Sequence, residues 1–368
     1  QAPTETVLPA QAQDVNDFES RVSAITEASR RLLAALGAWP DHPRICAYRQ
    51  MQVWDGDGSG QIAFDAADLH LPNLGHIVEN RLIQGALLER LQATPRIHLM
   101  LGQRPVGLWR DAGKQGLTLD TGERLTARLI VGADGALSRV RQWTGLPTRE
   151  WDYGHTAIVC TVKTERPHAH TAWQRFSPSG PLAFLPLSHG DAGEQYCSIV
   201  WSQLSTQAEA LMGLDDATFC EALGNAFEHR LGRIIGVSRR QGIPLRQRHA
   251  KDYVSTGCAL LGDAAHTIHP LAGQGVNLGF ADVRVLSEEL HRAAQRGLSP
   301  ADASVLQRYQ RRRKGENLAM MAAMEGFKQL FARDEPVLRW VRNAGMRWLD
   351  GQAALKRRVI AEAMGLHG

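Results

Sequence analysis

The chain has 368 residues, of which 43% are hydrophobic and 22% charged, an ordinary globular composition for one to three domains. Its net charge of +4 is too small to indicate nucleic-acid binding, and no apolar run is long enough to cross a bilayer. The five cysteines are scattered without a CxxC pair, which favours reduced thiols in a cytoplasmic protein and argues against a zinc site.

The amino-terminal third begins with about twenty residues that lack periodicity, and we expect them to form a loop. From Arg21 the apolar spacing predicts a helix that ends at Gly37. Residues 50–64 alternate apolar and polar side chains around a glycine-rich turn, which predicts a hairpin. Residues 80–91 predict an amphipathic helix, and Asn80 at its start suits an N-cap.

The next motif joins an expected buried strand to a glycine turn. Residues 128–131 are followed by Gly132, Ala133, Asp134 and Gly135, and we expect a helix to start near Ser138. Such a turn either binds a ligand or is a structural strand-to-helix connection that requires glycine.

The segment 153–248 predicts a mostly β region. We expect strands at residues 156–164, 182–187, 197–203 and 243–249, and a helix at residues 217–226. The apolar run 182–187 suits the lining of a pocket, although core packing is the expected role of its individual side chains.

A second strand, glycine loop and helix follow near residue 258. Residues 258–261 predict a buried strand, and residues 276–290 a helix whose apolar face leaves Asp282, Glu288 and Glu289 outside it. Asp263 follows the strand and can accept hydrogen bonds from ligand hydroxyls. The helix start offers free N–H groups to an oxyanion or phosphate, so we interpret the loop as a cofactor site rather than only a tight turn.

Residues 269–279, His-Pro-Leu-Ala-Gly-Gln-Gly-Val-Asn-Leu-Gly, resemble the second FAD-binding motif of the aromatic-ring flavoprotein monooxygenases. The sequence is most similar to the ubiquinone-biosynthesis hydroxylases of the 2-polyprenylphenol type, from about Arg21 to the C-terminus. This resemblance implies FAD, NAD(P)H and O2 as reactants in the hydroxylation of a polyprenylated phenol. It assigns no catalytic side chain, because the flavin carries the chemistry.

The resemblance also implies which residues bind the cofactors. Arg21 matches an arginine that meets FAD, and Asn80 matches a polar residue on the flavin side. The Asp-Gly motif expected to contact the FAD pyrophosphate and the nicotinamide cofactor corresponds to Asp134 and Gly135. The other predicted cofactor-binding residues are Asp263, Pro270, Gly273, Gly275, Val276 and Asn277. The histidines beside this loop lack further ligands at metal spacing, so no metal is expected.

Flavoproteins of this type open with a strand, GxGxxG and a helix, and this sequence has no GxGxxG after an apolar strand. We therefore expect the first βαβ unit to be absent and FAD to bind weakly or not at all without it.

The last fifty residues combine apolar stripes at helical spacing with many arginines, among them Arg339, Arg342 and Arg347. Packing against the protein body is one interpretation, and a peripheral membrane surface or a partner-binding face, as in a complex of ubiquinone-biosynthesis proteins, is the other.

Together these patterns predict an α/β fold: a Rossmann-like FAD-binding domain in discontinuous segments, a mostly β substrate domain and a helical C-terminus. The expected boundaries are residues 1–48, 77–150 and 250–315 for the FAD domain, 49–76 and 151–249 for the substrate domain, and 316–368 for the helices. The alternatives are a prenyl reductase or halogenase of the same fold, or an FAD-free assembly component.

Overall fold

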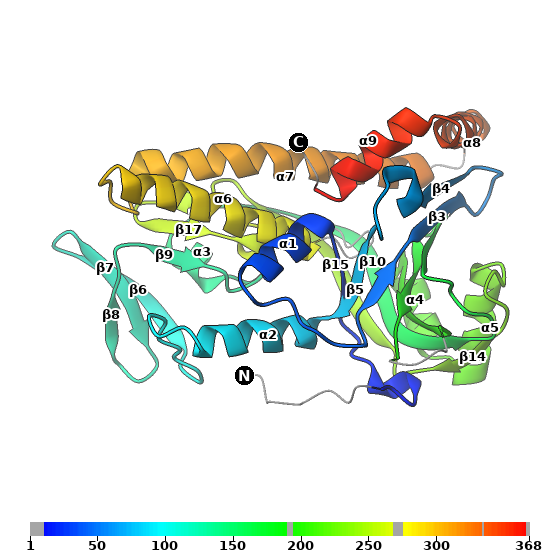
Figure 1. The fold of residues 1–368 in the computed structure, drawn as a ribbon, viewed down its shortest axis with the longest axis horizontal. Helices are drawn as coiled ribbons and strands as arrows, with labels where there is room; N and C mark the ends of the chain where they lie inside the picture. The colour runs from blue at the N-terminus through cyan, green and yellow to red at the C-terminus, as the bar shows by residue number, and fades with distance from the viewer. Residues whose placement is uncertain (1–10, 190–193, 268–274, 333–334, 366–368) are drawn as a thin grey trace.

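The computed structural model describes residues 11–189, 194–267, 275–332 and 335–365, which form an α/β fold (Figure 1). The strands are β1 (Val22–Ile25), β2 (Cys46–Tyr48), β3 (Gln50–Asp55), β4 (Gln61–Asp65), β5 (Gly75–Glu79), β6 (Pro105–Asp111), β7 (Lys114–Leu119), β8 (Arg124–Thr126), β9 (Ile130–Gly132), β10 (Thr148–Thr164), β11 (Thr171–Phe176), β12 (Leu182–Leu187), β13 (Tyr196–Leu204), β14 (Ile234–Val237), β15 (Gln241–Ala250), β16 (Val254–Ser255), β17 (Cys258–Leu260) and β18 (His266–Thr267). The helices are α1 (Glu27–Ala35), α2 (Asn80–Gln92), α3 (Arg139–Trp143), α4 (Ser205–Met212), α5 (Asp216–Ala226), α6 (Gly275–Gln295), α7 (Ala303–Ala332), α8 (Pro336–Asp350) and α9 (Ala353–Ala363), with short 3-10 helices η1 (Val15–Asp17), η2 (Ala66–Leu69) and η3 (Gly262–Ala264).

The largest sheet of the described residues has nine strands in the order β18-β15-β10-β13-β12-β11-β3-β4, with β14 beside β10. The predicted hairpin is confirmed as β3 and β4. It joins this sheet through parallel pairing of β3 with β11, which brings residues 50–65 beside strands more than a hundred residues later. The predicted strands and the helix α5 are confirmed, although β10 begins earlier than expected, at Thr148.

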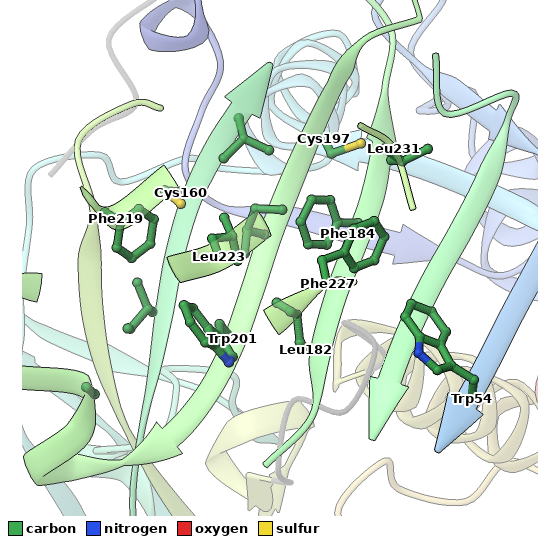
Figure 2. Close-up of a cluster of buried hydrophobic side chains, with 14 residues drawn as sticks. Trp54, Cys160, Leu182, Phe184, Cys197, Trp201, Phe219, Leu223, Phe227 and Leu231 are labelled. Carbon is green, nitrogen blue, oxygen red and sulfur yellow. The ribbon is translucent and has the colours of Figure 1, made fainter. Parts of the chain in front are cut away.

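Side chains of β12 separate onto the two faces of this sheet. Leu182 and Phe184 point into a core closed by α4 and α5, where Phe184 stacks on Phe227 at a ring-centroid distance of 3.7 Å (Figure 2). Ala183 and Leu185 pack into a separate cluster on the other face. Alternation in a fully buried strand produces two cores, and core packing is therefore the observed role of these four residues.

A small sheet carries the two glycine motifs. Strand β17 pairs parallel with β9 in the register Cys258↔Ile130 and Leu260↔Gly132. Parallel strands end at the same edge, so the turns that follow both strands lie together. Helices α6 and α7 run side by side along this part of the molecule (Figure 1).

The helix predicted from Arg21 is wrong over its first turn. Residues Val22–Ile25 form β1, which pairs antiparallel with β5, and α1 starts only after Thr26, whose hydroxyl caps it by accepting from the Ser29 N–H. The apolar spacing of this short segment fits either a helix or a strand, and its pairing with β5 makes it a strand. The expected end is confirmed, because α1 closes at Ala35 and Gly37 has a φ of +67°.

Two of the three acidic residues placed outside the apolar face of α6 are buried. Glu289 is fully buried, and its carboxylate pairs with Arg292, Arg308 and Arg312 at 2.8–3.0 Å. Asp282 is also fully buried. Helix α7 contacts α6 and supplies most of these arginines, so the helix pair encloses charges that a lone helix would leave in water.

The carboxy-terminal region is helical, as the spacing of its apolar residues predicted. One of its arginines, Arg342, packs against the body of the protein. The Arg342 side chain is 1% exposed, and its guanidinium lies 2.6 Å from the Asp55 carboxylate at the end of β3. This contact and Asn343 fasten α8 to the β3–β4 hairpin. The Arg339 side chain lies outside the described residues. None of the described helices is long and apolar enough to span a membrane.

Candidate cofactor site

The turns after β9 and β17 are joined by one buried arginine. The Leu261 N–H donates to the Gly132 carbonyl at 2.9 Å, which continues the β9–β17 pairing. Beyond it, Arg141 of α3 donates to the Ala136 and Ala264 carbonyls, both at 2.8 Å. Its side chain is buried, and desolvation lowers its pKa. Two motifs about 130 residues apart in sequence therefore form one surface.

Asp134 in the first motif binds the amino-terminal end of α3, whose N-cap is Ser138. Its carboxylate accepts from the Ser138 hydroxyl at 2.5 Å and from the backbone N–H groups of Arg139 and Val140 at 2.7 and 3.2 Å. A carboxylate at a helix N-terminus is favoured by the free amides and the helix dipole. Next to it, Gly135 has a φ of +80°, and a Cβ there would meet no atom within 4 Å. The Asp134 charge is thus neutralised by protein amides beside an accessible glycine backbone.

Asp263 in the second motif is solvent-exposed. Within the described part of the chain, no group hydrogen-bonds its carboxylate. Desolvation by the surrounding protein raises its pKa, and the nearby His266 and Arg21 act in the opposite direction. Arg21 is exposed too, and its guanidinium makes no hydrogen bond to the described residues. A carboxylate suits ligand hydroxyls and a guanidinium suits phosphate, so this pair fits the ribityl or ribose and diphosphate groups of FAD.

Asn80 begins α2 but does not cap it. The N-cap position belongs to Glu79, so the N-cap interpretation is wrong. The Asn80 N–H donates to the Arg21 carbonyl at 3.1 Å, and its side-chain oxygen accepts from the Ser23 hydroxyl at 2.7 Å. These bonds hold Asn80 beside Arg21, and its contact with the cofactor remains a prediction.

Asn277 lies near the start of α6, and its side chain binds protein. Its oxygen accepts from the Thr26 N–H at 3.1 Å, and its amide donates to the Ala24 carbonyl at 2.7 Å. The side chain therefore fixes α6 to the end of β1, which leaves its backbone for a ligand.

The remaining predicted cofactor residues divide into three cases. Val276 packs its side chain against a cluster that contains Ile25. Gly275 opens α6, and a Cβ there would meet nothing within 4 Å. Pro270 and Gly273 lie outside the described residues. In the described residues no group of side chains is arranged to hold a metal ion.

Two buried residues around this surface escaped the sequence analysis, namely Arg141 and Asp282. Buried charges are rare unless they are paired. The partners of Asp282 are 16 and 31 residues away, and the Ala264 carbonyl that Arg141 binds is 123 residues away, so no local pattern records these contacts. The only available signal for Asp282 was a carboxylate within an otherwise apolar stretch of helix.

The fold and this site define an FAD-binding protein. Residues 81–323 match the family described as FAD binding domain. The "3-demethoxyubiquinol 3-hydroxylase" of Escherichia coli K12 is 39% identical over 94% of this chain and 87% of its own length. The "Ubiquinone biosynthesis monooxygenase COQ6, mitochondrial" of Xenopus tropicalis is 34% identical over 94% of this chain and 83% of its own length.

The chain therefore belongs to the FAD-dependent hydroxylases of ubiquinone biosynthesis, and it is an FAD-dependent monooxygenase. Among solved structures, p-nitrophenol 4-monooxygenase PnpA from Pseudomonas putida DLL-E4 superimposes with a TM-score of 0.75 at 18% identity, over 95% of this chain and 89% of that one. That likeness supports the fold alone. NAD(P)H is the reductant typical of this family.

Proposed function

We propose that this protein hydroxylates the aromatic ring of a polyprenylated phenol, with NAD(P)H as reductant and O2 as oxidant. The observation that carries the proposal is 39% identity, over nearly the whole chain, to a protein named for hydroxylation of a ubiquinol ring. The exposed Asp263 carboxylate at the end of β17 supports the proposal. FAD activates the oxygen, and its ribityl and ribose hydroxyls can donate hydrogen bonds to such a carboxylate.

When bound and reduced, FAD supplies the oxygen activation. Asp263 accepts hydrogen bonds from cofactor hydroxyls, Arg21 pairs with a phosphate, and the open backbone at Gly135 permits close approach. The N–H groups of Gly275, Val276 and Asn277 belong to the first turn of α6, where amides lack helical acceptors. They stabilise negative charge on the cofactor at that helix start.

The test is incubation of the purified protein with FAD, NAD(P)H, a short-chain prenylated phenol and ¹⁸O₂. We expect a product heavier by one ¹⁸O, found by mass spectrometry, and no product without reductant. A product that gains two hydrogens and no oxygen would replace the proposal with a prenyl reductase. Halogen incorporation would indicate a halogenase, and absence of any flavin-dependent reaction would favour an assembly role.

A water-insoluble substrate must be delivered by a membrane or a partner protein, and we infer a peripheral membrane surface on α8 and α9. The side chain of Trp348 is 61% exposed, and Leu355 and Val359 are 37% and 40% exposed on one face of α9. Arg347 and Arg358 are exposed beside them. Apolar side chains flanked by arginines suit an anionic lipid surface.

Flotation with vesicles containing anionic lipid tests this surface at low and high salt. Arg347→Glu with Arg358→Glu should weaken binding by about thirtyfold or more, since each basic residue near such a surface contributes about 1 kcal/mol. Arg296→Glu changes the charge of an exposed residue at the end of α6 and is the matched control. If the unchanged protein, the double variant and the control bind vesicles equally well, the surface does not bind lipid, and a partner protein would have to deliver the substrate.

A further inference from the structure

We propose that Asp282 and Arg141 are positioning residues that fix the orientation of Asp263 by holding its turn from both sides. Neither residue reaches the solvent surface on which Asp263 lies, and both hydrogen-bond directly to the turn. The proposal rests on the cofactor role assigned to Asp263.

Asp282 holds the residues on either side of Asp263. One carboxylate oxygen accepts from the Gly262 N–H at 3.0 Å and from His266 Nε2 at 2.6 Å. Gly262 has a φ of +53°, in the left-handed region, so its peptide orientation depends on such a bond. An acceptor on α6 thereby sets where the chain turns at the end of β17.

The other Asp282 oxygen is held by α7. It accepts from Arg313 Nε at 2.7 Å, and the Asp282 and Arg313 side chains are 0% and 1% exposed. Asn317 joins the same pair by donating to Asp282 at 3.4 Å and accepting from Arg313 at 2.8 Å. A buried carboxylate with four donors on it has essentially one orientation, and this rigidity passes to Gly262.

Arg141 closes the turn from the side of α3. Its bond to the Ala264 carbonyl fixes the residue after Asp263, and its bond to Ala136 ties that residue to the first motif. Residues 262, 264 and 266 are thus each bonded to a buried side chain, while Asp263 between them keeps its carboxylate free of the described protein groups. This arrangement orients a ligand-binding carboxylate without occupying it.

A double-mutant cycle on FAD affinity tests the proposal. In the full chain, Asp282→Asn should raise the FAD dissociation constant about tenfold when Asp263 is present. In an Asp263→Ala background, the same change should raise it less than twofold, because Asp282 acts through Asp263. Fluorescence titration of FAD measures all four proteins.

Asp55→Asn is the matched control, because Asp55 and Arg342 form an equally buried pair remote from the turn. It should lower stability without changing FAD affinity. Amide exchange of the flavin-free protein gives a second readout, and Asp282→Asn should accelerate exchange in residues 258–267, whereas Asp55→Asn should not.

Additive effects in the cycle, or equal effects of Asp282→Asn and Asp55→Asn, would overturn the positioning role. Unchanged affinity in Asp263→Ala alone would overturn the cofactor role of Asp263, and the proposal with it. Neither result depends on hydroxylation of any substrate, so the proposed reaction is judged separately.

Discussion

Individual residues at the site differ in what they can offer a ligand. The Asp134 carboxylate and the Asn277 amide already bind backbone groups, whereas the Asp263 carboxylate and the Arg21 guanidinium have no partner among the described residues. Residue identity alone does not reveal this difference, because aspartate, asparagine and arginine all bind cofactors in proteins. We therefore expect substitution of Asp134 or Asn277 to lower stability, and substitution of Asp263 or Arg21 to lower FAD affinity.

Asp263→Ala should weaken FAD binding by one to two decades with little change in folding. Removing the carboxylate leaves ligand hydroxyls without an acceptor, at a cost of about 1–3 kcal/mol. The FAD dissociation constant and the thermal midpoint of the flavin-free protein measure the two effects. Asp134→Ala is the contrasting variant, and we expect it to lower the midpoint because two amides of the first turn of α3 lose their acceptor.

His168 should make the protein less stable in mild acid. Its Nε2–H donates to the Leu187 carbonyl at 3.0 Å and its Nδ1 accepts from the His170 N–H at 3.1 Å, so both nitrogens are satisfied in the neutral ring. Burial lowers its pKa to about 4, against 6.5 for a free histidine. Between these values the unfolded chain binds the extra proton, so stability falls as pH falls through this window.

Between pH 7 and pH 5, His168 should lower the free energy of unfolding by about 2 kcal/mol. Urea unfolding at both pH values should show a smaller difference for His168→Gln than for the unchanged protein. His98→Gln, at an exposed histidine, should leave the difference as it was. An equal loss in all three proteins would contradict the assignment.

Among the elements, α8 is attached to the β3–β4 hairpin by a buried ion pair and by hydrogen bonds of Asn343 and Asp350. The Asp55 carboxylate at the end of β3 contacts two nitrogens of the Arg342 guanidinium. It also accepts a hydrogen bond from the Asn343 amide at 3.1 Å. Phe331 at the end of α7 stacks on Phe176 of β11 at 4.3 Å, beside the Arg342 guanidinium. Helices α7 and α8 are therefore fastened to the large sheet at neighbouring points.

Asp55→Asn should lower the free energy of unfolding by about 3–5 kcal/mol, because it leaves the Arg342 charge buried without its counterion. Chemical denaturation measures the loss. We expect faster amide exchange in α8 in the same variant, and a change below 1 kcal/mol would show that water or another group compensates the arginine. Glu228→Gln is the comparison, since its partly exposed pair with Arg175 should contribute far less.

In the molecule as a whole, the predicted FAD contacts come from segments that are distant in sequence. They are Arg21, Asn80, the pair Asp134 and Gly135, and six residues between Asp263 and Asn277. A cofactor held by separate segments stabilises all of them together, because it binds only where the fold brings them into contact.

We therefore expect the thermal midpoint of the protein to rise steadily with added FAD. Each tenfold increase in FAD above the dissociation constant should add about 1.4 kcal/mol of stability. A thermal series over FAD concentration tests this. A midpoint of the flavin-free protein that does not change with added FAD would refute the expectation.

Much of this fold is determined by local patterns in the sequence. The β3–β4 hairpin, the strands β12 and β17, and the helices α2, α5 and α6 follow from periodicity, and the two glycine motifs were found from residue type and spacing. These features depend on side chains within a few residues of one another, and alternation and helical spacing report such neighbours directly. The family, and with it FAD, followed from the same motifs.

Other features were decided only by tertiary structure. Val22–Ile25 became a strand because β5 lies beside it, and Asp282 is buried because α7 brings Arg313 to it. For Arg342 the sequence left both packing and a membrane surface open, and the structure shows packing, because Asp55, 287 positions earlier in the chain, accepts a hydrogen bond from its guanidinium. Each outcome depends on a partner distant in sequence. A buried charge is stable only where the complete fold supplies its counterion, and local sequence carries no record of that partner.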